Sequence, residues 1–168
     1  MTETPYLRHA AGAIVSLRVI SSFAWLNSAL IGKDAKWAPS FLSGNGLAQR
    51  VSDTFVHTAM THGISHWLSD VVLPHVQFFA ISIAVADLAI GLSLLLGFLA
   101  RLGGALAILR TASNILIAAG MGADTIGFNV MLILAGAIVI VTAAGRRQGV
   151  DAILVKNSPS SGFLNFLA

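Results

Sequence analysis

The 168-residue sequence contains no cysteine, and Asp, Glu, Lys and Arg together make up only 10% of it. Without cysteine the chain can form no disulfide, thiol nucleophile or thiolate ligand for zinc or an iron–sulfur cluster. Soluble domains usually carry about 25% charged residues, so this chain could not cover a water-facing surface. The composition therefore excludes a soluble globular domain, a disordered chain and a fibrous protein.

Hydrophobic residues account for 56% of the chain and gather in four long stretches, over residues 10–31, 76–100, 102–121 and 126–145. Each stretch is long enough for a helix to cross a hydrocarbon core of about 30 Å. None shows the alternation of a membrane β-strand. The sequence predicts an all-α integral membrane protein, an antiparallel four-transmembrane-helix bundle that forms one membrane domain over the whole chain.

The connections between the stretches differ in length. Glycines predict tight turns at residues 101–104 and 122–127. The long segment 32–73 follows the first span, and its residues 51–72 are amphipathic. We expect one or two helices there, broken near Gly63 and lying at the outer membrane interface. Residues 146–168 form a tail.

Lys and Arg indicate the orientation, because cytoplasmic loops are enriched in them. The side with both termini and the turn between the second and third spans holds Arg8, Arg101, Arg146, Arg147 and Lys156, whereas the long loop holds Lys33, Lys36 and Arg50. This bias favours a multi-pass protein of the cell membrane with both termini in the cytoplasm. The formal net charge of +3 reflects topology, and scattered basic residues without interleaved aromatics argue against nucleic-acid binding.

Three charged residues, Arg18, Asp87 and Arg110, lie inside the spans. Such residues are costly in lipid and mark functional sites by default. Asp87 lies 14 residues before Arg101 and Arg110 lies 9 after it, which places them within about 8 Å of one depth. We expect an interior pair with Arg18 nearby, leaving one positive charge for an anion or a quinone oxygen. A salt bridge that only pins helix packing, or snorkelling of the arginines to the surface, would explain the same residues.

Several polar residues surround this group. Asn114 is four residues after Arg110 and shares its helix face. Lys33, Lys36 and Trp37 follow the first span, where they could meet a small anion or anchor a helix end at the headgroups. His62 and His66 have helical spacing but fall short of a recognised metal motif, so no metal site is predicted.

The uncharged polar and aromatic residues of the membrane boundary have simpler explanations. We expect Asn27 and Asn129 to form interhelical hydrogen bonds. Trp25, Trp37 and Trp67 are expected to form an aromatic belt at the outer boundary.

Three stretches of this sequence resemble a known family. The first is LRVI at residues 17–20 with Trp25 and the Lys36-Trp37 pair, the second is ADLAIGLSLLLGFLAR at 86–101, and the third is AGRRQGVDAIL at 144–154. They resemble the DoxD/DoxX family of small four-helix membrane proteins, although the acid at position 87 there is often glutamate. Within that family the chain is most similar to DoxD, which we take as the large membrane subunit of archaeal thiosulfate:quinone oxidoreductase.

This resemblance implies a subunit that oxidises thiosulfate to tetrathionate and passes electrons to a quinone acceptor, beside a small DoxA-like partner subunit. No bound prosthetic group is evident in the sequence. On this hypothesis Lys33, Lys36 and Trp37 would meet thiosulfate, while Arg18 would face a quinone oxygen or balance Asp87. The alternative is a non-catalytic accessory subunit of a terminal quinol oxidase or another respiratory complex, with the charges serving assembly.

Overall fold

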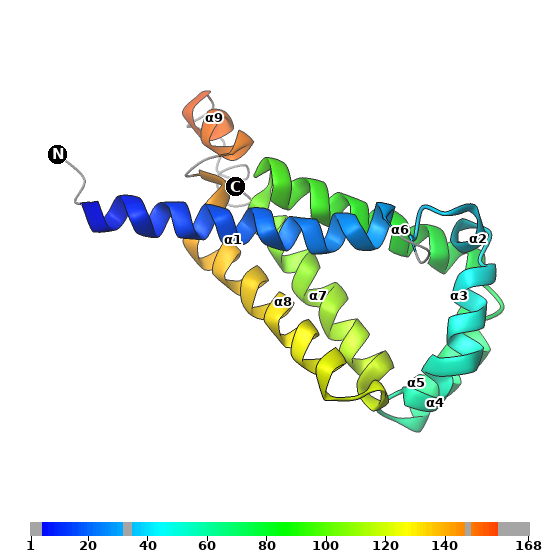
Figure 1. Ribbon diagram of the computed structural model, residues 1–168. Coiled ribbons are helices and arrows are strands. Elements are labelled where there is room, and N and C mark those ends of the chain that lie inside the picture. Colours follow the sequence, from blue (N-terminus) through cyan, green and yellow to red (C-terminus); the bar gives the residue numbers. More distant parts are fainter. Residues whose placement is uncertain (1–4, 32–34, 147–148, 158–168) are drawn as a thin grey trace.

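The computed structural model describes residues 5–31, 35–146 and 149–157, and every regular element among them is a helix (Figure 1). Four helices are long: α1 (Pro5–Leu30), α6 (Val76–Leu96), α7 (Ala100–Ala118) and α8 (Ala123–Thr142). Each is long and apolar enough to cross a membrane. The chain is thus a multi-pass membrane protein with an all-helical, four-span fold, as its hydropathy predicts. Lys33, Arg147 and the tail beyond Asn157 lie outside the described residues.

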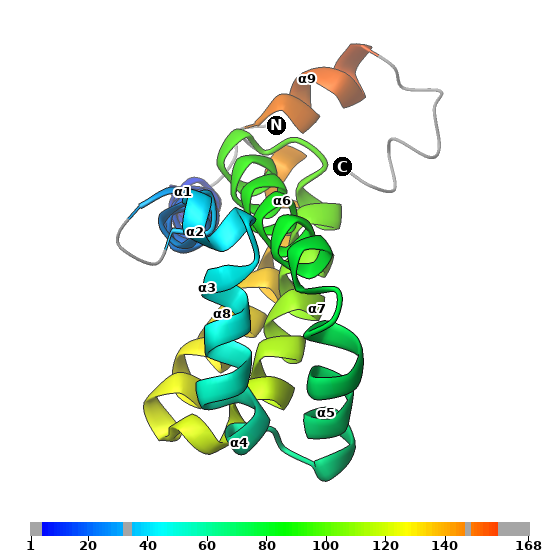
Figure 2. The same cartoon turned by 90° about the vertical axis from the view of Figure 1, so that its right-hand side faces the viewer.

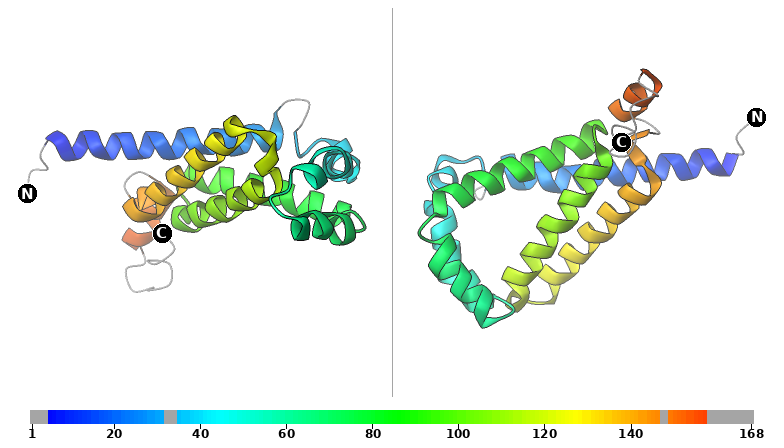
Figure 3. Two further views of the ribbon diagram at one scale, coloured as in Figure 1. Left: turned by 90° about the horizontal axis from the view of Figure 1, so that it is seen from below. Right: turned by 180° about the vertical axis from the view of Figure 1, so that it is seen from behind.

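The long helices form two antiparallel pairs, because α1 packs along α6 and α7 packs along α8. The pairs meet near the short helix α9 (Val150–Asn157) and diverge toward their other ends, so that the bundle has the shape of a V (Figures 1 and 3). We call the end beside α9 the narrow end and the opposite end the wide end.

Small residues allow α7 and α8 to pack closely. A Cβ atom built on Gly104 would lie 3.0 Å from the carbonyl oxygen of Gly136, and one on Gly136 would lie 3.0 Å from that of Gly104. Lipid offers no hydrophobic drive for two helices to associate, so close backbone approach and dispersion hold such pairs. This reciprocal contact fixes the register of α7 against α8.

The segment between α1 and α6 bridges the wide end of the V (Figure 2). It consists of short elements: α2 (Pro39–Leu42), α3 (Asn45–Arg50), a π-helical turn at Val51–Phe55, α4 (Val56–Thr58), α5 (His62–Trp67) and a second π-helical turn at Leu68–Val72. The break predicted near Gly63 is present slightly earlier, at residues 59–61 between α4 and α5. The helix stops before Thr61, whose side chain accepts a hydrogen bond from the Ile64 N–H at 3.3 Å and so caps α5.

Two clusters of buried residues form the core. The cluster toward the narrow end contains Trp25, Ile90, Leu94 and Val139. Trp25 is only 5% exposed, so its expected place in an interfacial belt is wrong, whereas Trp37 and Trp67 are about half exposed. The cluster at the wide end packs the bridging segment against α6 and α7, through Phe41, Leu47, Val51, Leu68, Val72 and Ala80.

The turn between α6 and α7 lies earlier than the sequence predicts. Gly97 and Leu99 carry the positive φ angles of this turn, 64° and 49°. Gly97 ends α6 in the left-handed conformation that glycine adopts without strain. Gly103 and Gly104 lie inside α7, where they provide room for neighbouring helices. The turn between α7 and α8 is shorter than the expected range of residues 122–127, since α8 begins directly after Gly122.

Candidate functional site

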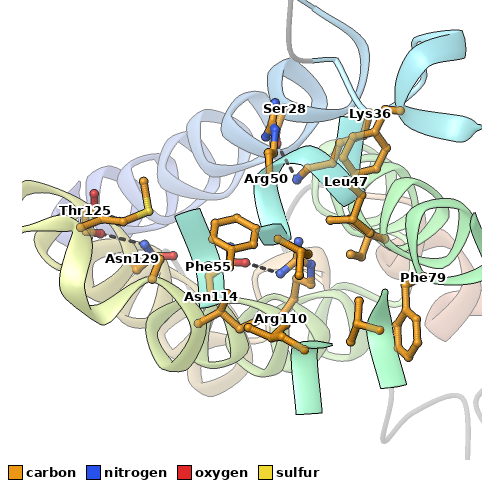
Figure 4. A pocket seen from close by; sticks show the side chains of 18 of the residues that line it. Ser28, Lys36, Leu47, Arg50, Phe55, Phe79, Arg110, Asn114, Thr125 and Asn129 are labelled. Atoms are coloured by element: carbon orange, nitrogen blue, oxygen red, sulfur yellow. Dashed lines mark hydrogen bonds between the residues drawn. The ribbon is translucent and has the colours of Figure 1, made fainter. Parts of the chain in front are cut away.

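A cavity of about 580 Å³ occupies the interior of the V beneath the bridging segment (Figure 4). Its walls are largely apolar, with Phe55, Phe79, Ile83 and Ile117 among the lining residues. The polar and charged lining residues come from three parts of the chain: Asn27 and Ser28 of α1, Lys36 and Arg50 of the bridging segment, and Arg110, Asn114, Thr125 and Asn129 of α7 and α8. This combination of apolar walls and a few convergent polar groups is typical of a ligand site.

Asp87 of α6 is fully buried and lies between two cations of this site. Its Oδ2 accepts a hydrogen bond from the Lys36 ammonium. Its Oδ1 lies 3.3 Å from Nε of Arg110 on α7. The predicted Asp87–Arg110 pair is confirmed, and Lys36 joins it to form a triad of two cations and one carboxylate.

Lys36 reaches Asp87 because the bridging segment folds back onto the end of α1. The backbone N–H of Lys36 donates to the Ser28 carbonyl at 3.3 Å, and that of Trp37 donates to the Ala29 carbonyl at 3.0 Å. The Lys36 ammonium also donates to the Ser28 hydroxyl at 2.8 Å. Burial lowers the pKa of Lys36, and the attraction of Asp87 opposes part of that shift.

Two further residues extend the polar end of the cavity. Arg110 donates through Nη1 to Oδ1 of Asn114, as expected for residues on one helix face. Arg50 lines both this cavity and a second, polar cavity of about 450 Å³, and its guanidinium lies 5.9 Å from the ring centre of Phe41. Sequence reasoning missed Arg50 as a site residue, because an arginine in a long loop gives no indication of depth.

Arg18 does not join this triad, so its expected place beside Asp87 is wrong. Its Nη1 donates to the Ala144 carbonyl at 3.1 Å, and Asp151 attracts it electrostatically. The reason is the register of α1, which extends past the narrow end. Leu26 is level with Gly91, and the Arg18 guanidinium lies against Gly97, in the turn after α6.

Asp151 organises this narrow-end junction. It is fully buried, and its carboxylate accepts the backbone N–H groups of Leu99 at 2.7 Å and Ala100 at 2.9 Å. These groups open α7, so Asp151 caps that helix from a distant part of the chain. Sequence reasoning assigned Asp151 no role, although it lies within the third stretch that resembles the family.

The remaining candidates lie apart from the triad. Trp37 is 40% exposed and is absent from the described lining residues. Asn129 donates within α8 to the Thr125 carbonyl at 2.7 Å rather than to another helix. His66 lies 4.0 Å from Asp70, and both side chains are exposed. Within residues 5–31, 35–146 and 149–157, no three histidine or acidic side chains gather as metal ligands.

Comparison with known proteins identifies the family. The profile of the family described as "TQO small subunit DoxD" matches residues 14–164, which include all three stretches noted in the sequence. No curated protein and no solved structure matches the chain. The description names DoxD as a small subunit, which corrects the expectation of a large one. Because the match covers most of the sequence, the chain belongs to the DoxD family.

Proposed function

We propose that this chain is a membrane subunit of a thiosulfate:quinone oxidoreductase and that its cavity binds thiosulfate beside Lys36 and Arg110. The observation that carries the proposal is the triad itself. Two cations share the single carboxylate of Asp87 at the buried end of the cavity. The triad therefore has a net charge of one positive unit, which favours a small anion beside Lys36 and Arg110.

The reaction needs this positive charge because it joins two dianions. Two thiosulfates form a bond between their terminal sulfur atoms and give tetrathionate, releasing two electrons. A quinone takes up these electrons with two protons and becomes the quinol. Lys36 and Arg110 would reduce the repulsion between the two anions as they approach, which is an electrostatic form of catalysis. A DoxA-like protein is the partner subunit that we propose.

The family match and the cavity support this proposal, and kinetics on the purified complex would test it. In proteoliposomes the complex should reduce a quinone only when thiosulfate is supplied. Lys36→Gln should raise the KM for thiosulfate about tenfold, the effect of losing one charge-assisted hydrogen bond.

The matched control for this experiment is Lys156→Gln, which removes an exposed lysine of α9. It should leave the KM for thiosulfate unchanged. Absence of thiosulfate-dependent quinone reduction in the unaltered complex would refute the proposed function. An unchanged KM in Lys36→Gln would remove the triad from the thiosulfate site.

A further inference from the structure

The cavity is covered unequally on its different sides. The bridging segment packs against α6 and α7, and the described residues of the wide-end core come from this segment, α6 and α7. On the remaining side the cavity is lined by the ends of α1 and α8, including Asn27, Ile31, Thr125 and Phe128. Figure 1 shows α8 diverging from α1 toward the wide end.

Two of these lining residues lie at the rim of the cavity. Ile31 is 64% exposed and Phe128 is 56% exposed, although both line the cavity. Both side chains therefore reach the surface of the molecule beside the cavity. We define the opening of the cavity between α1 and α8 by Asn27, Ile31 and Phe128.

This opening lies at membrane depth. Asn27 and Phe128 belong to candidate membrane spans, Ala11–Leu30 and Ala123–Thr142. Both residues are within about 8 Å of the wide-end limits of their helices, at 1.5 Å per residue. Placed by these spans, the opening lies in the outer part of one leaflet, beside the lipid chains.

The interior behind the opening has the chemistry of an amphiphile site. Apolar side chains, including Phe79, Ile83 and Ile117, line the path, and polar groups lie at its end. Asn114 accepts a hydrogen bond from Arg110 through Oδ1. The group that Asn114 can present to a ligand is therefore its side-chain NH2, which donates. A ligand that fits must dissolve in hydrocarbon and must present a hydrogen-bond acceptor at its leading end.

From these observations we infer that the acceptor quinone enters the cavity sideways from the bilayer, between α1 and α8. Its ring lies among the apolar residues, and one carbonyl accepts from Asn114. This inference rests on the proposed function, which supplies the quinone, and it assigns the route and subsite of that substrate. A cavity of about 580 Å³ falls within the range of about 300–1,000 Å³ that is common for small-molecule sites.

Photolabelling would test this route without depending on turnover. The complex is placed in proteoliposomes with an azido-substituted quinone, irradiated and digested, and the labelled peptides are identified. We expect label on the peptides of residues 24–31, 114–121 and 125–129. Phe128→Trp, which narrows the opening, should lower this labelling about tenfold, the size of effect that a small steric change has in an apolar site.

The matched control is Phe78→Trp, because Phe78 is 69% exposed on α6 near the same end of the bundle. It should leave the labelling of the cavity unchanged. Equal labelling in the Phe128→Trp and Phe78→Trp proteins, or label confined to the outer faces of the helices, would overturn the lateral route. Labelled cavity peptides in a complex that does not oxidise thiosulfate would refute the proposed function and leave the quinone route standing.

Discussion

The carboxylate of Asp87 is shared by two cations. The charge that remains in the triad therefore depends on which of its three residues is removed. Removing Lys36 would leave one carboxylate and one guanidinium, a neutral pair. Removing Asp87 would leave two largely buried cations, with side chains 13% and 18% exposed, facing each other. A buried charge without its partner usually costs far more than the pair itself contributes.

We therefore predict that Asp87→Asn lowers the free energy of unfolding by about 3–5 kcal/mol and that Lys36→Gln lowers it much less. Combining Asp87→Asn with Lys36→Gln should recover part of the loss, because one of the two repelling charges is removed. Thermal unfolding in detergent would measure these differences. Equal destabilisation by both single variants would show that Asp87 does not balance the two cations.

The lowered pKa of Lys36 predicts opposite effects of pH on binding and stability. Burial is the main cause of the shift, and Asp87, Arg110 and Arg50 act on the same group. As pH rises through this lowered pKa, toward the ordinary value of 10.5, Lys36 loses its charge and the KM for thiosulfate should rise. In the same window the unfolded chain binds more protons than the folded one, so stability should increase with pH.

Steady-state kinetics and thermal unfolding at alkaline pH would check both directions. Lys36→Arg is the informative variant, because arginine stays charged throughout this range. It should flatten the rise in KM below pH 10.5. A rise that persists unchanged in this variant would assign the titration to another group.

Only part of this triad could be predicted from the sequence. The depth of Asp87 and Arg110 follows from counting residues out from a single turn, since each helix advances 1.5 Å per residue. The contact of Lys36 with Asp87 could not be found in this way, because it depends on how the bridging segment folds back onto α1. The expected place of Arg18 beside Asp87 is wrong for a different reason. Counting residues gives depth within one helix, but it does not reveal that α1 is shifted along its axis relative to α6.

Among the helices, α7 depends most directly on a distant residue. Its first N–H groups are satisfied by Asp151, a residue of α9. We predict that Asp151→Ala lowers the free energy of unfolding by about 1–3 kcal/mol, the combined range for a helix cap and for hydrogen bonds to a charged group. Thermal unfolding, together with helix content measured by circular dichroism, would check this value.

The control for this prediction is Asp70→Ala, whose side chain is 73% exposed. It should change stability little. If Asp151→Ala also changed stability little, the first N–H groups of α7 would have hydrogen-bond acceptors other than Asp151. The quinone reductase rate per folded molecule should be the same in both variants, since Asp151 lies outside the cavity lining.

The four long helices were predictable because hydropathy and length leave few other structures in lipid. The bridging segment was predictable only as amphipathic. Its π-helical turns, Val51–Phe55 and Leu68–Val72, depend on packing against α6 and α7, which local sequence does not encode. The closeness of α7 and α8 depends likewise on Gly104 meeting Gly136, a pairing that only the assembled bundle reveals.

For the whole molecule, the orientation in the membrane is the next property to measure. The Lys and Arg bias predicts that the wide end lies outside the cell and α9 lies in the cytoplasm. Because the chain has no cysteine, single cysteines at Ser43 and Asn157 would give an unambiguous signal. An impermeant maleimide added to right-side-out vesicles should label Ser43→Cys and spare Asn157→Cys until the vesicles are opened. The reverse pattern would invert the orientation.

The contact of Arg18 with the Ala144 carbonyl also has a consequence for how the protein is made, because these residues are 126 positions apart. At roughly 5–20 residues per second, a ribosome needs about 6–25 s to synthesise that stretch. During this interval Arg18 is already synthesised while the Ala144 carbonyl is not, and its long side chain can extend toward the headgroups. The contact between Arg18 and the Ala144 carbonyl therefore forms only after the fourth span has been synthesised, and a ribosome that stalls before Ala144 leaves this link between the first and last spans unmade.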